Sequence, residues 1–366
     1  MLLRYCLPRV KNRGYGLGNE LIPWARAFLA AQVLNATLLP PAFGMNRRGY
    51  WWYFRSAPDD WIHNRAIEYL LPVVEFGEAD YVAHGAGDVV VALQGFAAAH
   101  RLFERRAYAL VTSGLWGGYR HIEAAREFIR STLYQSRHAA RNLLRLRSRI
   151  EPGKLLVGMH VRLGDFVAAG AAADYRRVAN MSLPIEWFCR VAQCLRRTLG
   201  EGWQLLLVSD GTQEQLQPLT SAWPCIITAD LPMGDCSDAL ALAGADLLVC
   251  SASTYSTLAA FLSDSPYLWY APNLYQHPEG AYSTGDYTQQ RERPGHPTRS
   301  ALEYFLSAQP QALPRGVAVQ EDGEVPAAVI DAAIARFEAR RWQTDLARAG
   351  VARAVGAGSA RQSLRA

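Results

Sequence analysis

The stretch LLVGMHVRLGD at Leu155–Asp165 changes abruptly from an apolar run into a charged turn. Leu155–Val161 predicts a buried strand. Open α/β sheets bind ligands beyond the carboxyl ends of their strands, and Arg162 would stand at that edge. Its planar guanidinium suits phosphate oxygens, and His160 would share its face of the strand. The alternative is an ion pair between Arg162 and Asp165 that holds a loop, with His160 in the core.

The second half of the chain alternates short apolar strands with helices. This alternation predicts an α/β fold with a parallel sheet and helices on both of its faces. The predicted strands are Leu155–Val161, Trp203–Val208, Pro224–Thr228, Asp246–Cys250 and Tyr267–Tyr270. The predicted helices are Pro184–Leu199, Ser237–Gly244 and Ser256–Leu262.

The amino-terminal end predicts a strand, a glycine-rich loop and a helix, in that order. Leu2–Leu7 forms the strand, and the loop contains Gly16 and Gly18. Asn19 is a suitable N-cap for the helix Glu20–Asn35. Backbone N–H groups at such a helix start bind anions, although the glycine spacing differs from the dinucleotide fingerprint GxGxxG. A tight connection that binds no ligand is the alternative.

The rest of the first half is less regular. The predicted elements are a strand at Ala36–Leu39, a strand and loop at Asp88–Leu93 and a long helix at His121–Ile150. Ala107–Gly118 has a mixed pattern that predicts no single element. We divide the chain into domains at residues 1–150 and 151–325, followed by a helix and a basic tail at 326–366.

The segment Gly49–Trp61 is rich in aromatic residues and also carries carboxylates. Aromatic faces can stack on sugar rings, and carboxylates can bond sugar hydroxyls. The candidates for contact with a sugar acceptor are Trp51, Trp52, Asp59 and Asp60. The alternative is a packed cluster of side chains under a loop.

Composition narrows the class of protein. The 366 residues suffice for two domains, and 50% of them are hydrophobic, as in globular proteins. The net charge of +5 suits small anionic ligands and is not the concentrated basic patch of a nucleic-acid-binding protein. The six cysteines form no CxxC pair, which indicates a reducing compartment. No apolar run approaches the ~20 residues that span a bilayer, and the start does not resemble a signal peptide, so we expect a cytoplasmic protein.

Polar residues follow three of the predicted strands in the second half. They are Arg162, Asp210 and the run Ser251–Ser256, which opens a helix. Hydroxyl and N–H groups at a helix start form a phosphate site, with ordinary N-capping as the alternative. Asp238 lies on the preceding helix and can reach the same crevice. Because a carboxylate accepts the paired ring N–H and amino donors of guanine, Asp238 is the candidate for binding that base.

These residues resemble motifs of the bacterial and animal α-1,2-fucosyltransferases. Gly16–Ala31 is similar to the glycine–asparagine opening of that family. HVRLGD at His160–Asp165 resembles its HxRRGD motif, which α-1,6- and protein O-fucosyltransferases carry in variant form. Val208–Gly211 resembles its second motif. Asp238–Leu258 resembles its third motif, with Ser253–Ser256 at the expected interval after the aspartate.

The chain departs from this pattern at several positions. Leu163 stands where the motif has a second arginine, and Gly211 stands where the family has a second acid. Thr257 and Leu258 stand where tryptophans follow the serine run.

The resemblance implies the GT-B architecture, in which two Rossmann-like domains face a central cleft. It also implies an inverting glycosyltransferase that moves fucose from GDP-fucose to a glycan hydroxyl, with no metal ion and no cofactor besides the GDP-sugar. Under this hypothesis we expect the protein neither to bind nucleic acid nor to span a membrane. The alternatives are another GDP-hexose donor, or a non-catalytic nucleotide- or carbohydrate-binding protein. A Rossmann dehydrogenase fits poorly, because no acidic residue ends the predicted strand near Leu39.

In this hypothesis Arg162 and the hydroxyls of Ser253 and Thr254 stabilise the charge that develops on the departing GDP. Asp165 is the candidate general base, and the two carboxylates of the aromatic segment are further candidates. The remaining donor-site candidates are Gly16, Gly18, Asn19, His160, Asp210, Asp238, Tyr255 and Ser256. The acceptor, the linkage and the oligomeric state do not follow from the sequence.

Overall fold

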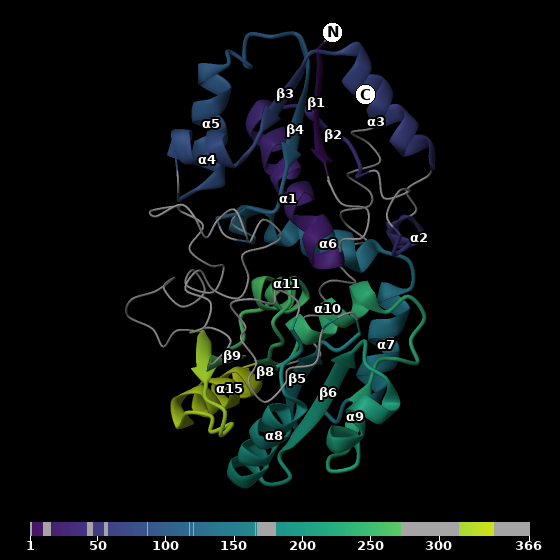
Figure 1. Cartoon of the computed structure of the whole chain (residues 1–366), viewed down its shortest axis with the longest axis vertical. Coiled ribbons are helices and arrows are strands. Elements are labelled where there is room, and N and C mark those ends of the chain that lie inside the picture. The colour runs from purple at the N-terminus through teal and green to yellow at the C-terminus, as the bar shows by residue number, and fades with distance from the viewer. Residues whose placement is uncertain are drawn as a thin grey trace.

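The computed structural model has two lobes, each built on a parallel β-sheet with helices packed against it (Figure 1). It describes residues 2–9, 16–41, 47–54, 58–85, 87–116, 118–119, 121–164, 166, 181–271 and 315–339. Every strand pairing in both sheets is parallel. The predicted α/β fold with a parallel sheet and packed helices in each of two lobes is confirmed.

The N-lobe is built on a sheet with the strand order β2-β1-β4-β3. Its strands are β1 (Leu3–Arg9), β2 (Thr37–Leu38), β3 (Val73–Phe76) and β4 (Ala107–Ser113). Its helices are α1 (Leu17–Leu34), α2 (Tyr50–Phe54), α3 (Pro58–Leu70), α4 (Glu78–Gly85) and α5 (Val89–Ala99). Alternate strand residues point to opposite faces, so Cys6 and Leu110 join the α1 core while Leu7 and Val111 pack with Ile67 of α3.

The C-lobe is built on a sheet with the strand order β10-β9-β8-β5-β6-β7. Its strands are β5 (Leu155–Val161), β6 (Trp203–Ser209), β7 (Cys225–Ile227), β8 (Leu247–Val249), β9 (Tyr267–Tyr270) and β10 (Gly316–Val319). Its helices are α8 (Ile185–Leu199), α9 (Gln213–Thr220), α10 (Asp235–Ala243), α11 (Thr254–Leu262) and α15 (Ala327–Ala339). Every residue of β5 is buried, as expected for a central parallel strand with helices on both sheet faces.

The predicted long helix at His121–Ile150 is wrong, because three shorter elements occupy this stretch. They are η2 (Glu123–Ala125), α6 (Arg126–Gln135) and α7 (Ala139–Arg149). The chain turns between α6 and α7, where His138 has a left-handed φ of 68°. Asn142 of α7 donates a hydrogen bond of 2.9 Å to the Pro232 carbonyl. This helix therefore packs with the C-lobe, although it precedes the division that we predict at residue 150.

The predicted strand at Asp88–Leu93 is also wrong, because this segment begins helix α5. The carboxylate of Asp88 accepts hydrogen bonds from the N–H groups of Val90 and Val91, at 2.6 and 3.1 Å. This N-cap and the burial of Val89, Leu93 and Phe96 outweigh the strand preference of three successive valines. The stretch without a clear pattern at Ala107–Gly118 contains β4, the strand between β1 and β3.

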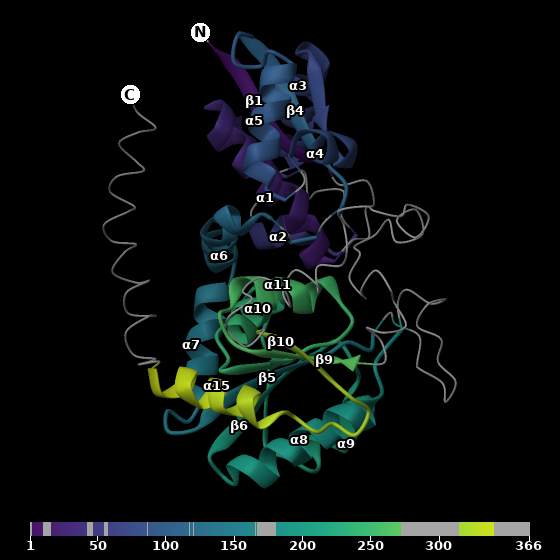
Figure 2. The same ribbon diagram turned by 90° about the vertical axis from the view of Figure 1, so that its left-hand side faces the viewer.

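The carboxyl ends of the two sheets face each other. Figure 1 shows β1 and β4 running down toward the C-lobe and β6 running up toward the N-lobe. Strands β5 and β8 are neighbours, but the chain continues from β5 through α8 to β6 on one side and from β8 through α11 to β9 on the other. Their ends form the topological switch point at which open α/β sheets bind ligands. Figure 2 shows α10 and α11 on the side of the C-lobe that faces the N-lobe.

Among the described helices, none alone combines the length and apolar character of a membrane span. Helices α4 and α5 reach that length and apolar character only as a pair, and the pair is bent by 93° at its junction.

Candidate functional site

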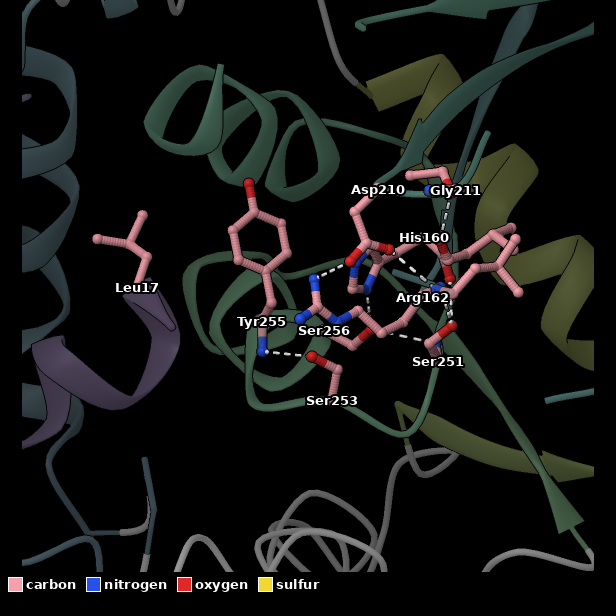
Figure 3. A network of polar contacts seen from close by, with 12 residues as sticks. Leu17, His160, Arg162, Asp210, Gly211, Ser251, Ser253, Tyr255 and Ser256 are labelled. Carbon is pink, nitrogen blue, oxygen red and sulfur yellow. Dashed lines mark hydrogen bonds and ion pairs between the residues drawn. The ribbon is translucent and has the colours of Figure 1, made fainter. Parts of the chain in front are cut away.

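The site predicted around Arg162 lies at the switch point between β5 and β8. The N–H of Arg162, directly after β5, donates a hydrogen bond of 2.9 Å to the hydroxyl of Ser251. That hydroxyl donates in turn to the carbonyl of His160, at 2.7 Å. Figure 3 shows the Arg162 side chain extending toward Ser253 and Tyr255 at the start of α11. The fold thus brings together the strand end and the helix start that the sequence separates by about ninety residues.

Asp210 holds the guanidinium of Arg162. The two side chains form an ion pair, and the other carboxylate oxygen of Asp210 accepts the N–H of Leu163 at 2.9 Å (Figure 3). Burial on its own would raise the pKa of Asp210, but these bonds outweigh burial and keep the pKa below its ordinary value. Asp210 is therefore an ionised partner that orients Arg162. Its predicted contact with the donor stays a prediction.

His160 supports the site from within the core. Its Nδ1 lies 2.7 Å from the hydroxyl of Ser256, and that hydroxyl accepts the N–H of Ser251 at 3.0 Å. Burial, with a smaller contribution from the charge of Arg162, lowers the pKa of His160 to about 3. The ring is therefore neutral at physiological pH. It fixes the start of α11 to the end of β5, and it cannot serve there as a cationic phosphate ligand.

The start of α11 supplies the predicted hydroxyl groups. Ser253 is the N-cap, and its hydroxyl accepts the N–H of Tyr255 at 3.2 Å. The hydroxyl of Tyr255 donates to the carbonyl of Asp235 in α10, and its ring lies beside His160. Of the predicted run, Ser253, Thr254 and Tyr255 are partly exposed at the helix start, whereas Ser256 is buried.

Asp238 has the properties expected of a base-binding carboxylate. It lies in the first turn of α10, where Oδ2 accepts a hydrogen bond of 2.8 Å from Thr228. Within the described part of the chain, Oδ1 is buried and has no hydrogen-bond partner. Burial raises the pKa of this carboxyl to about 8, even though the bond from Thr228 lowers it. A buried acceptor without a donor is costly, and guanine offers two adjacent donors.

The glycine–asparagine turn of the N-lobe lies against the same helix start. A Cβ on Gly18 would come within 2.6 Å of the Thr254 carbonyl oxygen, so the absence of a side chain is what allows α1 and α11 to touch. Gly16 has open space around it. Asn19 follows in the first turn of α1, and among the described residues its Oδ1 is buried without a partner. Their predicted contacts with the donor stay a prediction.

Two departures from the fucosyltransferase motifs are in contact with each other. Leu163 stands in place of an arginine and Gly211 in place of an acid. A Cβ on Gly211 would come within 2.5 Å of the Leu163 side chain. In this chain the two positions form an apolar contact, in which Leu163 packs on Gly211.

The predicted acceptor residues are only partly described. Trp51 and Trp52 stack with 4.0 Å between ring centroids, and Trp52 is half exposed. They lie on α2, next to the start of α1, because the Tyr50 hydroxyl accepts the N–H of Leu17 at 2.7 Å. The side chains of Asp59 and Asp60 and the whole of Asp165 lie outside the described residues.

The sequence did not predict a polar cluster at the carboxyl edge of the N-lobe sheet. Glu75 of β3 accepts a hydrogen bond from the hydroxyl of Ser113 in β4 and forms an ion pair of 3.2 Å with Arg9 of β1. Arg9 and Ser113 are register partners at the ends of their strands. The sequence gives little signal for it, because Val73–Phe76 is short and Glu75 is its one polar residue. Among the described residues, no group of three His, Cys, Asp or Glu side chains could hold a metal ion.

No family model matches the chain, and no curated protein sequence matches it. It is similar in structure to the fucosyltransferase NodZ from Bradyrhizobium, with 14% identity, coverage of 72% of this chain and 94% of that chain, and a TM-score of 0.44. It is also similar to the α-1,6-fucosyltransferase NodZ soaked with GDP-fucose, with 15% identity, coverage of 71% of this chain and 93% of that chain, and a TM-score of 0.42. A third similar structure is POFUT1 in complex with GDP-fucose, with 12% identity, coverage of 73% of this chain and 96% of that chain, and a TM-score of 0.42. At such low identities and TM-scores, the function of this chain follows from its own residues and not from these similarities.

Proposed function

We propose that this protein is an inverting glycosyltransferase that transfers a sugar, most naturally fucose, from a GDP-sugar to a glycan hydroxyl. One observation supports this above the others: the partly buried guanidinium of Arg162 and the hydroxyl-bearing start of α11 meet at the switch point of the C-lobe. The unpartnered carboxyl oxygen of Asp238, on the helix that packs beside α11, supports guanine as the base.

The proposed reaction breaks the bond between C1 of the sugar and an oxygen of the β-phosphate. The acceptor oxygen attacks C1 from the opposite face, so the configuration at C1 inverts, and GDP leaves with the bonding electrons. Arg162, with Ser253 and Thr254, stabilises the negative charge that develops on the leaving phosphate. In this scheme the guanidinium supplies the positive charge, and no metal ion or further cofactor takes part. The acceptor proton passes to a carboxylate, for which Asp165 remains the candidate.

Arg162→Ala and Arg162→Lys test the proposal. A charge-assisted hydrogen bond contributes about 1.5–3 kcal/mol, so we expect Arg162→Ala to slow the release of GDP from GDP-fucose by about one to two orders of magnitude. The lysine variant should recover only part of the loss, because an ammonium cannot bond two phosphate oxygens as a planar fork does. Arg197→Ala is the matched control, since Arg197 pairs with Glu324 on the surface of α8. Unchanged turnover by Arg162→Ala would remove this residue from the mechanism.

Nucleotide and donor specificity need a second experiment. We expect GDP to raise the unfolding temperature more than UDP does, and GDP-fucose to be consumed faster than GDP-mannose. The replacement of the second motif arginine by Leu163 favours one further candidate, a non-catalytic GDP-binding protein. Calorimetric binding of GDP without turnover of any GDP-sugar would support that candidate instead.

A further inference from the structure

Tyr119 connects the N-lobe to the helix that carries the proposed phosphate site. It lies in the turn that follows β4, and it is fully buried. Its hydroxyl donates a hydrogen bond of 2.5 Å to the carbonyl of Gly18 in α1. Its ring stacks on Phe261 of α11, with 4.9 Å between the ring centroids. One side chain therefore contacts both the start of α1 and the C-terminal half of α11.

Helix α11 contacts α1 of the N-lobe at its start and α6 further along. At its start, the carbonyl of Thr254 lies against Gly18, where a Cβ would approach within 2.6 Å. Further along, the guanidinium of Arg126 lies 5.6 Å from the ring centroid of Phe261. At its end, Arg130 of α6 donates a hydrogen bond to the carbonyl of Leu262. The position of α11 is thus set by α1 and α6 as well as by the C-lobe elements on which it packs.

The direction of this helix decides where its first turn points. Hydrogen-bond donors lower a reaction barrier only when they are aimed at the place where charge develops. A displacement of about 1 Å in a supporting element is enough to reduce such a contribution strongly. Ser253 and Thr254 begin α11, so whatever holds α11 also aims them.

We infer that Tyr119 is a positioning residue that fixes the first turn of α11 relative to Arg162. The inference deepens the proposed function and rests on it, because the turn matters for catalysis only if it binds the donor phosphates. The hydroxyl and the ring have separate parts in this role. The hydroxyl anchors Tyr119 to the glycine turn of α1, and the ring carries the contact to Phe261.

Three variants separate this role from a general loss of stability. Tyr119→Leu removes the hydroxyl and the stacked ring, whereas Tyr119→Phe removes the hydroxyl alone. Tyr81→Leu is the matched control, because Tyr81 is also buried and stacks on Trp116 at 4.9 Å, but within the N-lobe. All measurements are made on the full chain, well below the unfolding temperature of each variant.

The first readout needs no ligand. We expect amide hydrogen exchange across residues 254–258 to be at least tenfold faster in Tyr119→Leu than in the wild type, with Tyr119→Phe in between. Tyr81→Leu should exchange there at the wild-type rate. Unchanged exchange in both Tyr119 variants, or the same acceleration in Tyr81→Leu, would overturn the positioning role.

The second readout is calorimetric titration with GDP. We expect Tyr119→Leu to bind GDP at least tenfold more weakly, Tyr119→Phe to recover much of the affinity, and Tyr81→Leu to bind as the wild type does. Faster exchange with wild-type GDP affinity would overturn the link between Tyr119 and the phosphate site. Faster exchange in Tyr119→Leu, together with a wild type that binds no GDP, would keep the positioning of α11 and overturn the proposed function.

Discussion

Asp238 predicts a pH dependence of nucleotide binding. Its pKa of about 8 means that the carboxyl is mostly protonated at pH 7. Guanine presents two donors, and only the carboxylate can accept both, so binding must release the proton. We expect the affinity for GDP to rise about tenfold per pH unit below pH 8 and to level off above it. Titration calorimetry at pH 6, 7, 8 and 9 measures this slope. A flat profile across that range would contradict the assignment of Asp238 to the base.

Asp238→Asn provides the control and has an opposite effect on stability. An aspartate has a pKa of about 3.9 in the unfolded chain, so the folded state holds the proton more tightly. The free energy of unfolding therefore falls as the pH rises from about 4 to about 8. Asparagine never ionises and escapes this loss. We expect the variant to bind GDP weakly at every pH, yet to unfold at a higher temperature than the wild type at pH 9. A lower unfolding temperature at pH 9 would show that the carboxylate stabilises the fold.

At the scale of residues, the sequence predicted the chemistry of the site but few of its contacts. Arg162 and Ser253 could be placed because each follows a recognisable strand, and strand ends in a parallel sheet meet at one edge. The pairing of Arg162 with Asp210 could not be predicted, since Asp210 lies 48 residues away along the chain and Asp165 lies much nearer. The neutral state of His160 follows from burial, which depends on tertiary packing.

At the scale of elements, prediction succeeded in the C-lobe and was weaker in the N-lobe. Buried parallel strands are continuous apolar runs, and β5 and β9 have the predicted bounds. In the N-lobe, Val89–Val91 resembles a strand but begins α5. The Asp88 cap is local, whereas the buried face of the helix depends on tertiary packing. Strand β4 is buried between β1 and β3, although its sequence has no clean alternation. Strand β10 pairs with β9 after a long stretch of chain, which no local pattern reveals.

The contact between α1 and α11 predicts different effects for two neighbouring glycines. Gly18→Ala places a methyl group 2.6 Å from the Thr254 carbonyl, so α11 must shift even though alanine favours a helix. We expect a lower unfolding temperature and at least tenfold weaker GDP binding. Gly16→Ala is the control for stability, because nothing lies within 4 Å of the added carbon and the backbone there is extended. Thermal unfolding of both variants and GDP titration of Gly18→Ala measure these effects. Equal behaviour of the two would contradict a tight contact at Gly18.

At the scale of the whole molecule, the two facing sheet edges suggest a division between donor binding and acceptor binding. The edge of the C-lobe carries the groups proposed to bind the GDP-sugar. The opposite edge of the N-lobe carries Arg9, Glu75 and Ser113, three polar side chains from three neighbouring strands. A transferase must hold its acceptor opposite its donor, so we expect the acceptor hydroxyls to bind at this N-lobe edge.

Glu75→Gln tests that division. Glu75 is 43% exposed, so its carboxylate is accessible to an acceptor hydroxyl although Arg9 bonds Oε2 and Ser113 bonds Oε1. We expect the variant to lower kcat/KM about tenfold or more for an acceptor found by screening oligosaccharides, because an amide accepts a hydroxyl proton poorly. GDP affinity and donor hydrolysis should stay at wild-type values. Glu68→Gln is the matched control, since Glu68 shares the partner Arg9 at 3.3 Å but lies on α3 and is 13% exposed. An equal loss in both variants would assign Glu75 to the stability of the ion-pair cluster, and a loss of GDP affinity would show that the two edges do not act separately.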